Sequence, residues 1–299
     1  MKNGALSDSK EKGSFLREAY AYFLTLPASL IIGGLILLVY VLIAIFANQI
    51  ASYTYNKVGV GPPFGQPSWE YLMGTDQLGR DVFSRVVYGT RYVLVLSVAG
   101  TALGLAVGGL LGLICGYVGG LFDEAVMRIS EVFISIPFIV LALVVIAAAG
   151  PELSGNPLLL ISVIAIVYAP RSARMARAVA MEVSARDFIT VARLRGEKFW
   201  SIALRELLPM TTGTLLVEFS VRAGYAPVLI GSLGFLGFGA KPPSPEWGLM
   251  ISENRNAIII APWTVLGPGI ALALLVVSLN FCTEGIARVI GRSIQHTPV

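Results

Sequence analysis

Glu218 and Arg222 stand four residues apart inside a stretch, residues 207–240, that carries no other charge. The chain is 56% hydrophobic and only 13% charged, so charges within such a stretch need a reason. On a helix, this spacing lets the carboxylate and the guanidinium neutralise each other. A structural ion pair is the preferred interpretation, and a polar lining for a substrate route is the alternative.

Residues for catalysis are scarce. The phosphate-binding pattern G-x-x-x-x-G-K-[ST] needs a Gly-Lys step, which this sequence lacks. His296 is the only histidine, and Cys115 and Cys282 lie in apolar runs, where we expect core residues rather than a disulfide. No nucleophile–base or metal-ligand cluster stands out. We therefore expect no catalytic, cofactor or metal site in this chain, and a membrane enzyme is disfavoured.

Basic residues gather between residues 171 and 205, with eight arginines and lysines against three acids. Three interpretations compete: a nucleic-acid patch, a loop on the basic side of a membrane, and a docking element for another protein. No zinc spacing or other nucleic-acid motif accompanies the charges, so nucleic acid is not an expected partner.

A mean hydropathy of +0.76 is too high for a soluble globular chain. Uncharged runs of about 20 residues indicate membrane-spanning helices. They occur at residues 23–47, 92–122, 132–151, 153–170 and 256–283, and residues 207–240 are interrupted only by the pair above. The sequence predicts an all-α, multi-pass membrane protein with six spans, the first too long for a signal-peptide core.

Basic residues favour cytoplasmic segments. With the N-terminus inside, fifteen fall in inner segments and six in outer ones, which predicts an N-in, C-in topology. The expected organisation is a cytoplasmic N-terminal segment (1–22), a membrane domain (23–290) and a cytoplasmic tail (291–299). Within the domain lie an external segment (50–91), a cytoplasmic loop (171–209) and an external loop (237–262).

The cytoplasmic loop also has a helical apolar pattern. Phe188, Val191, Ala192, Leu194 and Phe199 recur at helical spacings, with Trp200 adjacent. A glycine inside a helix costs about 1 kcal/mol, so Gly196 indicates a bend or a close approach. We predict two short helices meeting there, the second ending before Pro209, which would start the fifth span. Such a pair could rest on lipid headgroups or fill a groove in a partner.

Residues 187–209 resemble the conserved cytoplasmic loop of the membrane subunits of bacterial ABC importers. Ala192, Gly196, Leu208 and Pro209 fall on its spacing, whereas Thr190, Val191 and Glu206 depart from it. MGTDQLGRDVFSRVVYGTR (73–91) and GFLGFGAKPPSPEWGLMISENRN (234–256) are similar to signatures of the dipeptide, oligopeptide and nickel permeases. The resemblance covers residues 20–285 and points to the second, C-type permease, with departures at residues 230 and 281–291 that bear on the substrate.

The resemblance implies a type I ABC importer permease that forms half of a translocation path in a prokaryotic cytoplasmic (inner) membrane. Its implied partners are a second homologous permease, an extracytoplasmic binding protein and two cytoplasmic ATPases that hold ATP and Mg. Peptides are the expected cargo, with nickel complexes or oligosaccharides as alternatives. A self-sufficient secondary transporter or channel is disfavoured, because Glu218 is the sole deep acid. The resemblance to ABC importer permeases also implies a set of ATPase-docking residues. They are Asp187, Phe188, Ala192, Arg193, Gly196, Phe199, Trp200, Arg205, Leu208 and Pro209.

The external signatures supply further candidates. We expect Asp76 to cap a short interfacial helix that leads into the second span, and Asp81 to pair with Arg85 on its exposed side. Three prolines stiffen residues 241–247, and a rigid loop there suits either a cargo-delivering protein or a plain connector. The signature residues are Gly74, Thr75, Asp76, Gly79, Arg80, Asp81, Pro242, Pro243, Trp247 and Gly248.

The second span carries a glycine at every fourth residue. Small side chains let another backbone approach closely, so the pattern predicts tight helix packing. The packing partner is either a helix of this chain or one of a second permease. The residues are Gly100, Gly104, Gly108, Gly112, Gly116 and Gly120.

Overall fold

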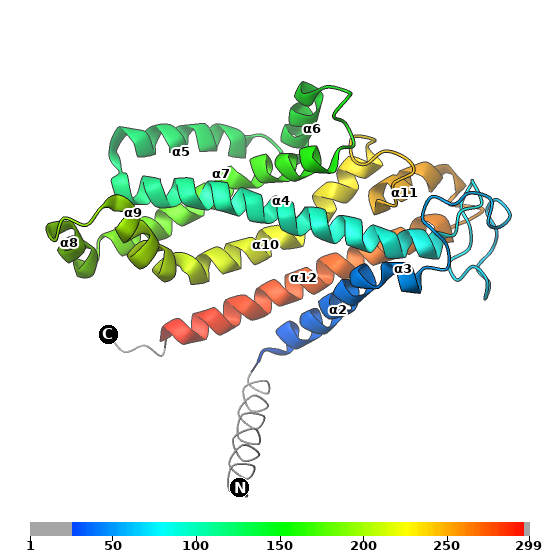
Figure 1. The fold of residues 1–299 in the computed structure, drawn as a ribbon, viewed down its shortest axis with the longest axis horizontal. Coiled ribbons are helices and arrows are strands. Elements are labelled where there is room, and N and C mark those ends of the chain that lie inside the picture. The colour runs from blue at the N-terminus through cyan, green and yellow to red at the C-terminus, as the bar shows by residue number, and fades with distance from the viewer. Residues whose placement is uncertain (1–25, 296–299) are drawn as a thin grey trace, which may run out of the picture.

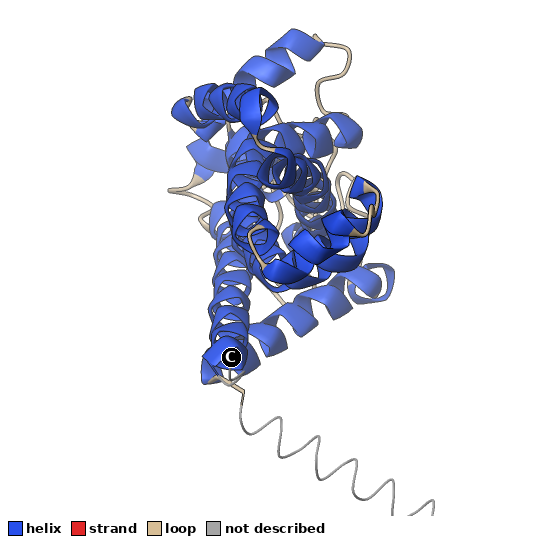
Figure 2. Ribbon diagram, turned by 90° about the vertical axis from the view of Figure 1, so that its left-hand side faces the viewer, coloured by secondary structure: helices blue, strands red, loops and turns tan. Residues whose placement is uncertain are grey.

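The computed structural model describes residues 26–295, with side-chain burial up to residue 290. Those residues are helical apart from loops and one isolated bridge between Thr75 and Asp81 (Figure 2). The predictions for residues 1–22 and for His296 lie outside the described part of the chain. The burial of the 291–295 side chains is likewise not described.

Long helices form an elongated bundle (Figure 1). The long helices are α2 (Ala28–Ile45), α4 (Val82–Val118), α7 (Pro157–Ser184), α10 (Leu208–Phe235) and α12 (Trp263–Gln295). The shorter ones are α3 (Ala47–Ile50), α5 (Gly120–Ser135), α6 (Phe138–Ala149), α8 (Asp187–Leu194), α9 (Phe199–Ile202), a π-helical turn η1 (Ala203–Leu207), α11 (Trp247–Asn254) and a 3-10 turn η2 (Arg255–Ala257).

Five helices in the described residues are long and apolar enough to cross a membrane, and a bent pair makes up to six. The bent pair, α5 and α6, corrects the prediction of one straight span over residues 132–151, because the two helices meet at 100°. Pro137 explains the break, since a residue before proline avoids the helical region and Ile136 is extended (φ −79°, ψ 130°).

The two ends of the bundle differ. The end of α4 and the start of α10 lie with α8 and α9 at one end, which we call the α8–α9 end. The start of α4, α3, α11 and the irregular segment 51–81 lie at the opposite end (Figure 1). α4 and α7 therefore run in the same direction, with α5 and α6 returning the chain between them, whereas α2 and α10 run antiparallel to α12.

The most extensive helix–helix contact in the described residues joins α4 to α7. Five glycines of α4 face α7, and a Cβ added at Gly108 would lie 2.2 Å from the carbonyl oxygen of Ala169. The neighbours of the other four are Ile164, Ala165, Ala173 and Ala180. The packing partner is thus a helix of the same chain. Gly120 lies outside this contact, because α4 ends at Val118 and Gly120 begins α5 with open space around it.

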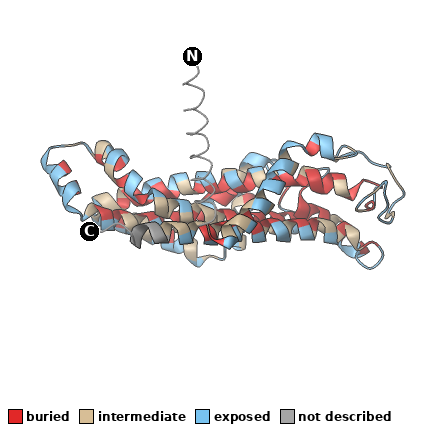
Figure 3. Cartoon of the chain, turned by 90° about the horizontal axis from the view of Figure 1, so that it is seen from below, coloured by how far each residue is buried: buried red, intermediate tan, exposed pale blue. Residues whose placement is uncertain are grey.

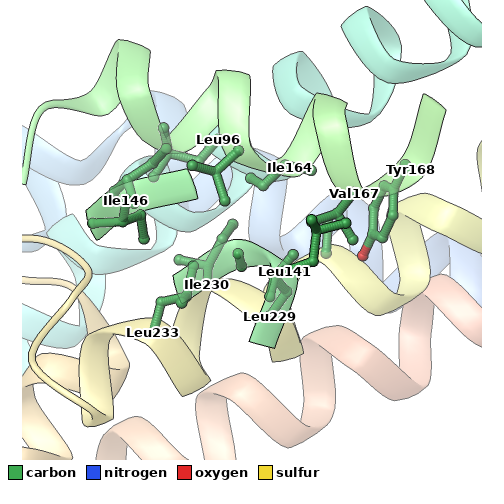
Figure 4. Close-up of a cluster of buried hydrophobic side chains, with 13 residues drawn as sticks. Leu96, Leu141, Ile146, Ile164, Val167, Tyr168, Leu229, Ile230 and Leu233 are labelled. Atoms are coloured by element: carbon green, nitrogen blue, oxygen red, sulfur yellow. The ribbon is translucent and has the colours of Figure 1, made fainter. Parts of the chain in front are cut away.

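Four helices share one buried apolar cluster (Figure 4). It joins Leu96 of α4, Ile146 of α6, Ile164 of α7 and Ile230 of α10. Outside the cluster, many large apolar side chains are exposed along α2, α4, α10 and α12 (Figure 3). Such a surface is stable in a lipid environment, where apolar side chains meet hydrocarbon rather than water.

Candidate functional site

The segment 187–207 at the α8–α9 end folds as α8, a turn at residues 195–198, α9 and η1. Ile189 and Ala192, one turn apart on α8, are fully buried. They join Val183 of α7 and Ile202 and Leu207 of the following segment in one cluster, against which Tyr117 and Phe199 also pack. The segment is therefore anchored to the ends of α4 and α7 rather than lying free.

Gly196 ends α8. Its φ of +74° is the left-handed conformation, which glycine adopts without a Cβ clash. The Gly196 N–H donates to the carbonyl of Arg193 at 2.9 Å, and the Glu197 N–H donates to that of Ala192 at 3.2 Å. This pair of bonds is a Schellman motif. The predicted bend is present, but nothing approaches the glycine within 4 Å, so the alternative of a close approach is wrong.

The outward face of α8 is also apolar. Phe188, Val191 and Leu194 are exposed, Leu194 by 82%, and we call these three the α8 face. Arg193 does not extend freely beside them, because its guanidinium stacks 4.2 Å above the ring centre of Tyr117. The sequence pattern predicts only that these apolar residues recur at helical spacings. The structure divides them between the buried Ala192 and the exposed α8 face.

The second helix of the loop does not end before Pro209, contrary to prediction. α9 continues through η1 into α10, and Pro209 lies in the first turn of α10. A proline ring clashes with the carbonyl four residues earlier in an α-helix. The carbonyl four residues before Pro209 belongs to Arg205, which lies in the wider π-helical turn η1. The wider turn accommodates the proline ring, so the helix continues past Pro209 without a break. Along this continuous stretch, Trp200, Arg205 and Leu208 are exposed and Phe199 is half-buried against Tyr117.

The two external signatures meet at the opposite end in a buried charge network. Asp76 pairs with Arg80 at 2.6 Å and with Arg85 at 2.9 Å. Glu253 of α11 pairs with the same two arginines at 2.8 and 3.1 Å. Two arginines and two carboxylates thus balance in charge, as buried charges must if they are not to cost several kcal/mol each.

This network corrects three predictions. Asp76 caps no helix, and its carboxylate accepts from the N–H groups of Leu78 and Arg80 in a turn. Asp81 does not pair with Arg85, because it caps α4 by accepting from the N–H of Ser84 at 2.8 Å. No separate interfacial helix exists in residues 82–91, since α4 runs unbroken from Val82.

Glu246 was not singled out from the sequence, because glutamate is not a favoured N-cap residue. Its buried carboxylate caps α11 by accepting from the N–H groups of Gly248 and Leu249, both at 2.7 Å. Burial raises the pKa of Glu246 to about 7, and the two backbone N–H donors oppose that shift.

The neighbouring signature residues hold this end together. Trp247 is fully buried and donates to the Val86 carbonyl at 3.1 Å, so it packs inside the protein rather than at a lipid interface. Gly248 packs against the backbone of Gly231. The Thr75 hydroxyl accepts from the Gly65 N–H at 2.7 Å. Gly74 and Gly79 have positive φ in the turns of this segment, whereas Pro242 and Pro243 are exposed.

Glu218 and Arg222 form an ion pair in α10 at 2.7 Å. Glu218 is buried and faces Ser172 of α7, whose hydroxyl lies 3.4 Å from the same carboxylate oxygen. Arg222 remains partly exposed. Both residues lie in α10, which follows directly after η1.

Comparison with known proteins decides the family. Residues 108–296 match the model of the binding-protein-dependent transport system inner membrane component. A dipeptide transport system permease protein, DppC, of Alkalihalophilus pseudofirmus is 37% identical over 86% of this chain and 83% of its own length. The chain belongs to this permease family.

Other relatives support the assignment. The glutathione transport system permease protein GsiD of Pectobacterium atrosepticum is 34% identical over 85% of this permease and 83% of the relative. The MetNI methionine ABC transporter, in an inward-facing structure, is 19% identical with a TM-score of 0.53, covering 70% of this chain and 97% of that one. The fold is therefore that of a type I ABC importer permease. This permease is a transport subunit rather than an enzyme, and its family works with an ATPase and a substrate-binding protein.

Proposed function

We propose that this permease and a second homologous permease each form half of a path for di- or oligopeptides across a prokaryotic cytoplasmic (inner) membrane. The relatives named for dipeptide and glutathione transport support a peptide cargo. Two cytoplasmic ATPases, which hold ATP and Mg, supply the energy. The N- and C-termini lie on the ATPase side.

The segment 187–207 is the proposed ATPase-docking element, and one observation carries this assignment. α8 is anchored through Ile189 and Ala192 while its opposite side presents the apolar α8 face beyond the ends of the long helices. A solvated loop would gain nothing from exposing Leu194 by 82% at the end of a bundle. A partner groove that accepts an apolar helix face gives this surface a function.

The same geometry supports a mechanism. A partner shifts a conformational equilibrium only through different affinities for the two states. Closure of the ATPases would displace α8, whose anchor includes residues of α7 and η1. Because η1 continues into α10, the displacement would reach the helix that carries Glu218 and Arg222.

The docking proposal is tested with Leu194→Glu and a matched control, Leu121→Glu. Leu121, near the same end, is 85% exposed and lies outside the α8 face. Burying a leucine contributes roughly 1.5–3 kcal/mol, so Leu194→Glu should weaken ATPase binding about tenfold or more. Co-purification of the ATPases with a tagged permease measures this. Equal ATPase recovery with both variants would contradict the docking role.

Uptake assays test the cargo. In cells that lack their own peptide importers, the complete system should accumulate radiolabelled dipeptide, and unlabelled peptide should compete. Competition by nickel complexes or oligosaccharides instead would assign one of those cargoes. Transport by the permease alone in proteoliposomes, without ATPases, would favour a secondary transporter and refute the importer.

A further inference from the structure

A hollow of about 770 Å³ opens at the external end of the bundle. We call it the outer hollow. α4 provides Tyr88, Arg91 and Tyr92, and the proline-rich loop provides Lys241 and Pro243. Its volume falls within the roughly 300–1,000 Å³ of sites that bind small molecules. None of the segment 187–207 lines it, so it is separate from the docking element.

The length of α4 explains where the outer hollow lies. A helix of 37 residues is about 55 Å long, whereas the hydrocarbon core of a bilayer is about 30 Å thick. The uncharged part of α4 begins after Arg91. Residues 82–91 thus extend outward from the span, and the outer hollow lies at the outer mouth of the membrane domain.

The charge of the outer hollow has one sign. Arg91 and Lys241 line it, and its lining contains no aspartate or glutamate. Neither cation forms a salt bridge within the described residues. Opposite charges within about 4–6 Å stabilise each other, so this lining favours an anionic group.

Both cations are held in place by other parts of the chain. Arg91 donates from Nε and Nη2 to the carbonyls of Ala44 and Ile45 at the end of α2, at 2.8 and 3.1 Å. Lys241 donates to the Pro151 carbonyl at 3.1 Å, and its stem packs against Gly155. These bonds position the two cations while leaving donors on each available, because an ammonium has three and a guanidinium five.

The remaining lining is aromatic and apolar. Tyr88 packs edge-on against Tyr55 at 5.4 Å between ring centres, and Tyr92 and Pro243 complete the surface. Rings beside cations suit a ligand with an acidic end and apolar side chains. We propose that the outer hollow binds the free C-terminal carboxylate of a small peptide during its passage. This inference depends on the proposed peptide cargo and assigns the permease a substrate contact of its own.

Photolabelling of the assembled permease–ATPase complex, without the binding protein, tests the proposal. The probe is alanyl-p-benzoylphenylalanine with a free carboxylate, compared with its C-terminal amide. The acid should label residues 88–95 or 241–245, identified by mass spectrometry, and the amide should label them weakly. This comparison needs no variant and so survives any folding defect. Equal labelling by acid and amide, or labelling elsewhere only, would overturn the proposal.

Lys241→Gln should reduce labelling about fivefold, the upper range for one partly exposed charge pair, and Lys241→Arg should retain it. Lys57→Gln is the matched control, because Lys57 is an external cation that does not line the outer hollow and lies 5.4 Å from the ring centre of Tyr53. Equal loss in Lys57→Gln would overturn the proposal.

Two other occupants are outcomes of the same experiments. Loss of labelling in nanodiscs of phosphatidylglycerol, but not of phosphatidylcholine, would assign the outer hollow to a lipid phosphate. Weaker binding-protein affinity in Lys241→Gln, with labelling unchanged, would assign it to an acidic side chain of that protein. Either would refute a peptide site. Peptide uptake by the complete importer without labelling of the outer hollow would refute only this inference and leave the proposed cargo standing.

Discussion

Replacing Gly108 with alanine tests the α4–α7 contact most directly. The new Cβ would stand 2.2 Å from the Ala169 carbonyl oxygen and 2.9 Å from its carbonyl carbon, both backbone atoms. Ordinary contact begins near 3.4 Å, so the helices would have to separate locally by about 1.2 Å. Overpacking of this kind typically costs about 1–3 kcal/mol.

Gly109, the next residue, is the matched control. A Cβ there would meet nothing closer than 3.9 Å, the distance to a methyl group of Leu215. Alanine is favoured over glycine in a helix by up to about 1 kcal/mol, so Gly109→Ala should be neutral or stabilising. Because the same gain in helix propensity applies at Gly108, the two neighbouring substitutions should differ by the overpacking cost alone, about 1–3 kcal/mol in the free energy of unfolding.

The assay is thermal unfolding of the purified permease in detergent, followed by fluorescence-detected size exclusion. Gly108→Ala should unfold at a clearly lower temperature than the wild type, and Gly109→Ala should not. If Gly108→Ala is as stable as the wild type, or if both variants lose equal stability, the close approach of these helices is not what stabilises the bundle.

Two further substitutions test buried charges. Arg222→Ala should leave the Glu218 carboxylate buried without its partner and destabilise the protein by about 3 kcal/mol. This is the low end for a broken buried ion pair, because Arg222 is partly exposed. The double variant Glu218→Gln/Arg222→Ala should recover part of the lost stability in thermal unfolding. Burial raises the pKa of Glu246 from 4.5 to about 7, so its contribution to stability is present below pH 4.5 and is lost as pH rises through 7, by up to about 3 kcal/mol. Between pH 5 and 8 the unfolding temperature of the wild type should therefore fall more than that of Glu246→Gln. An equal fall in both proteins would contradict this.

Patterns that depend on composition and local spacing were readable from the sequence. Uncharged runs identified five helices because a membrane span must be long and apolar whatever packs beside it. The glycines at every fourth residue of α4 indicated close packing for a similar reason, since the spacing is local. The sequence could not identify α7 as the packing partner, because the groove left by glycines accepts the backbone of any helix.

Contacts between distant residues were not readable. The i, i+4 spacing predicted that Arg85 pairs with Asp81, the nearest acid on the same helix face. In the structure Asp81 instead accepts from the Ser84 N–H in the first turn of α4, and Glu253, 168 residues from Arg85 in the sequence, pairs with Arg85. The sequence also did not determine which side of α8 faces the protein, because both Ile189 and Val191 are apolar. Contact with the ends of α4 and α7 buries Ile189 and leaves Val191 exposed.

The arrangement divides the molecule into a rigid part and a movable one. α4 is continuous from its cap at Asp81, beside the external charge network, to Tyr117, which packs against Phe199 of the segment 187–207. Its glycines bring it into backbone contact with α7, so we expect these two helices to move as one body. In contrast, α5 begins at two glycines with positive φ and open space, and the break at Pro137 separates it from α6. A force applied at α8 would therefore rotate the α4–α7 unit as a whole, while the bent pair adjusts around it. The outer hollow, lined partly by α4, would change shape with that rotation, which on the proposed function would link ATPase docking to the cargo without any deformation of α4 itself.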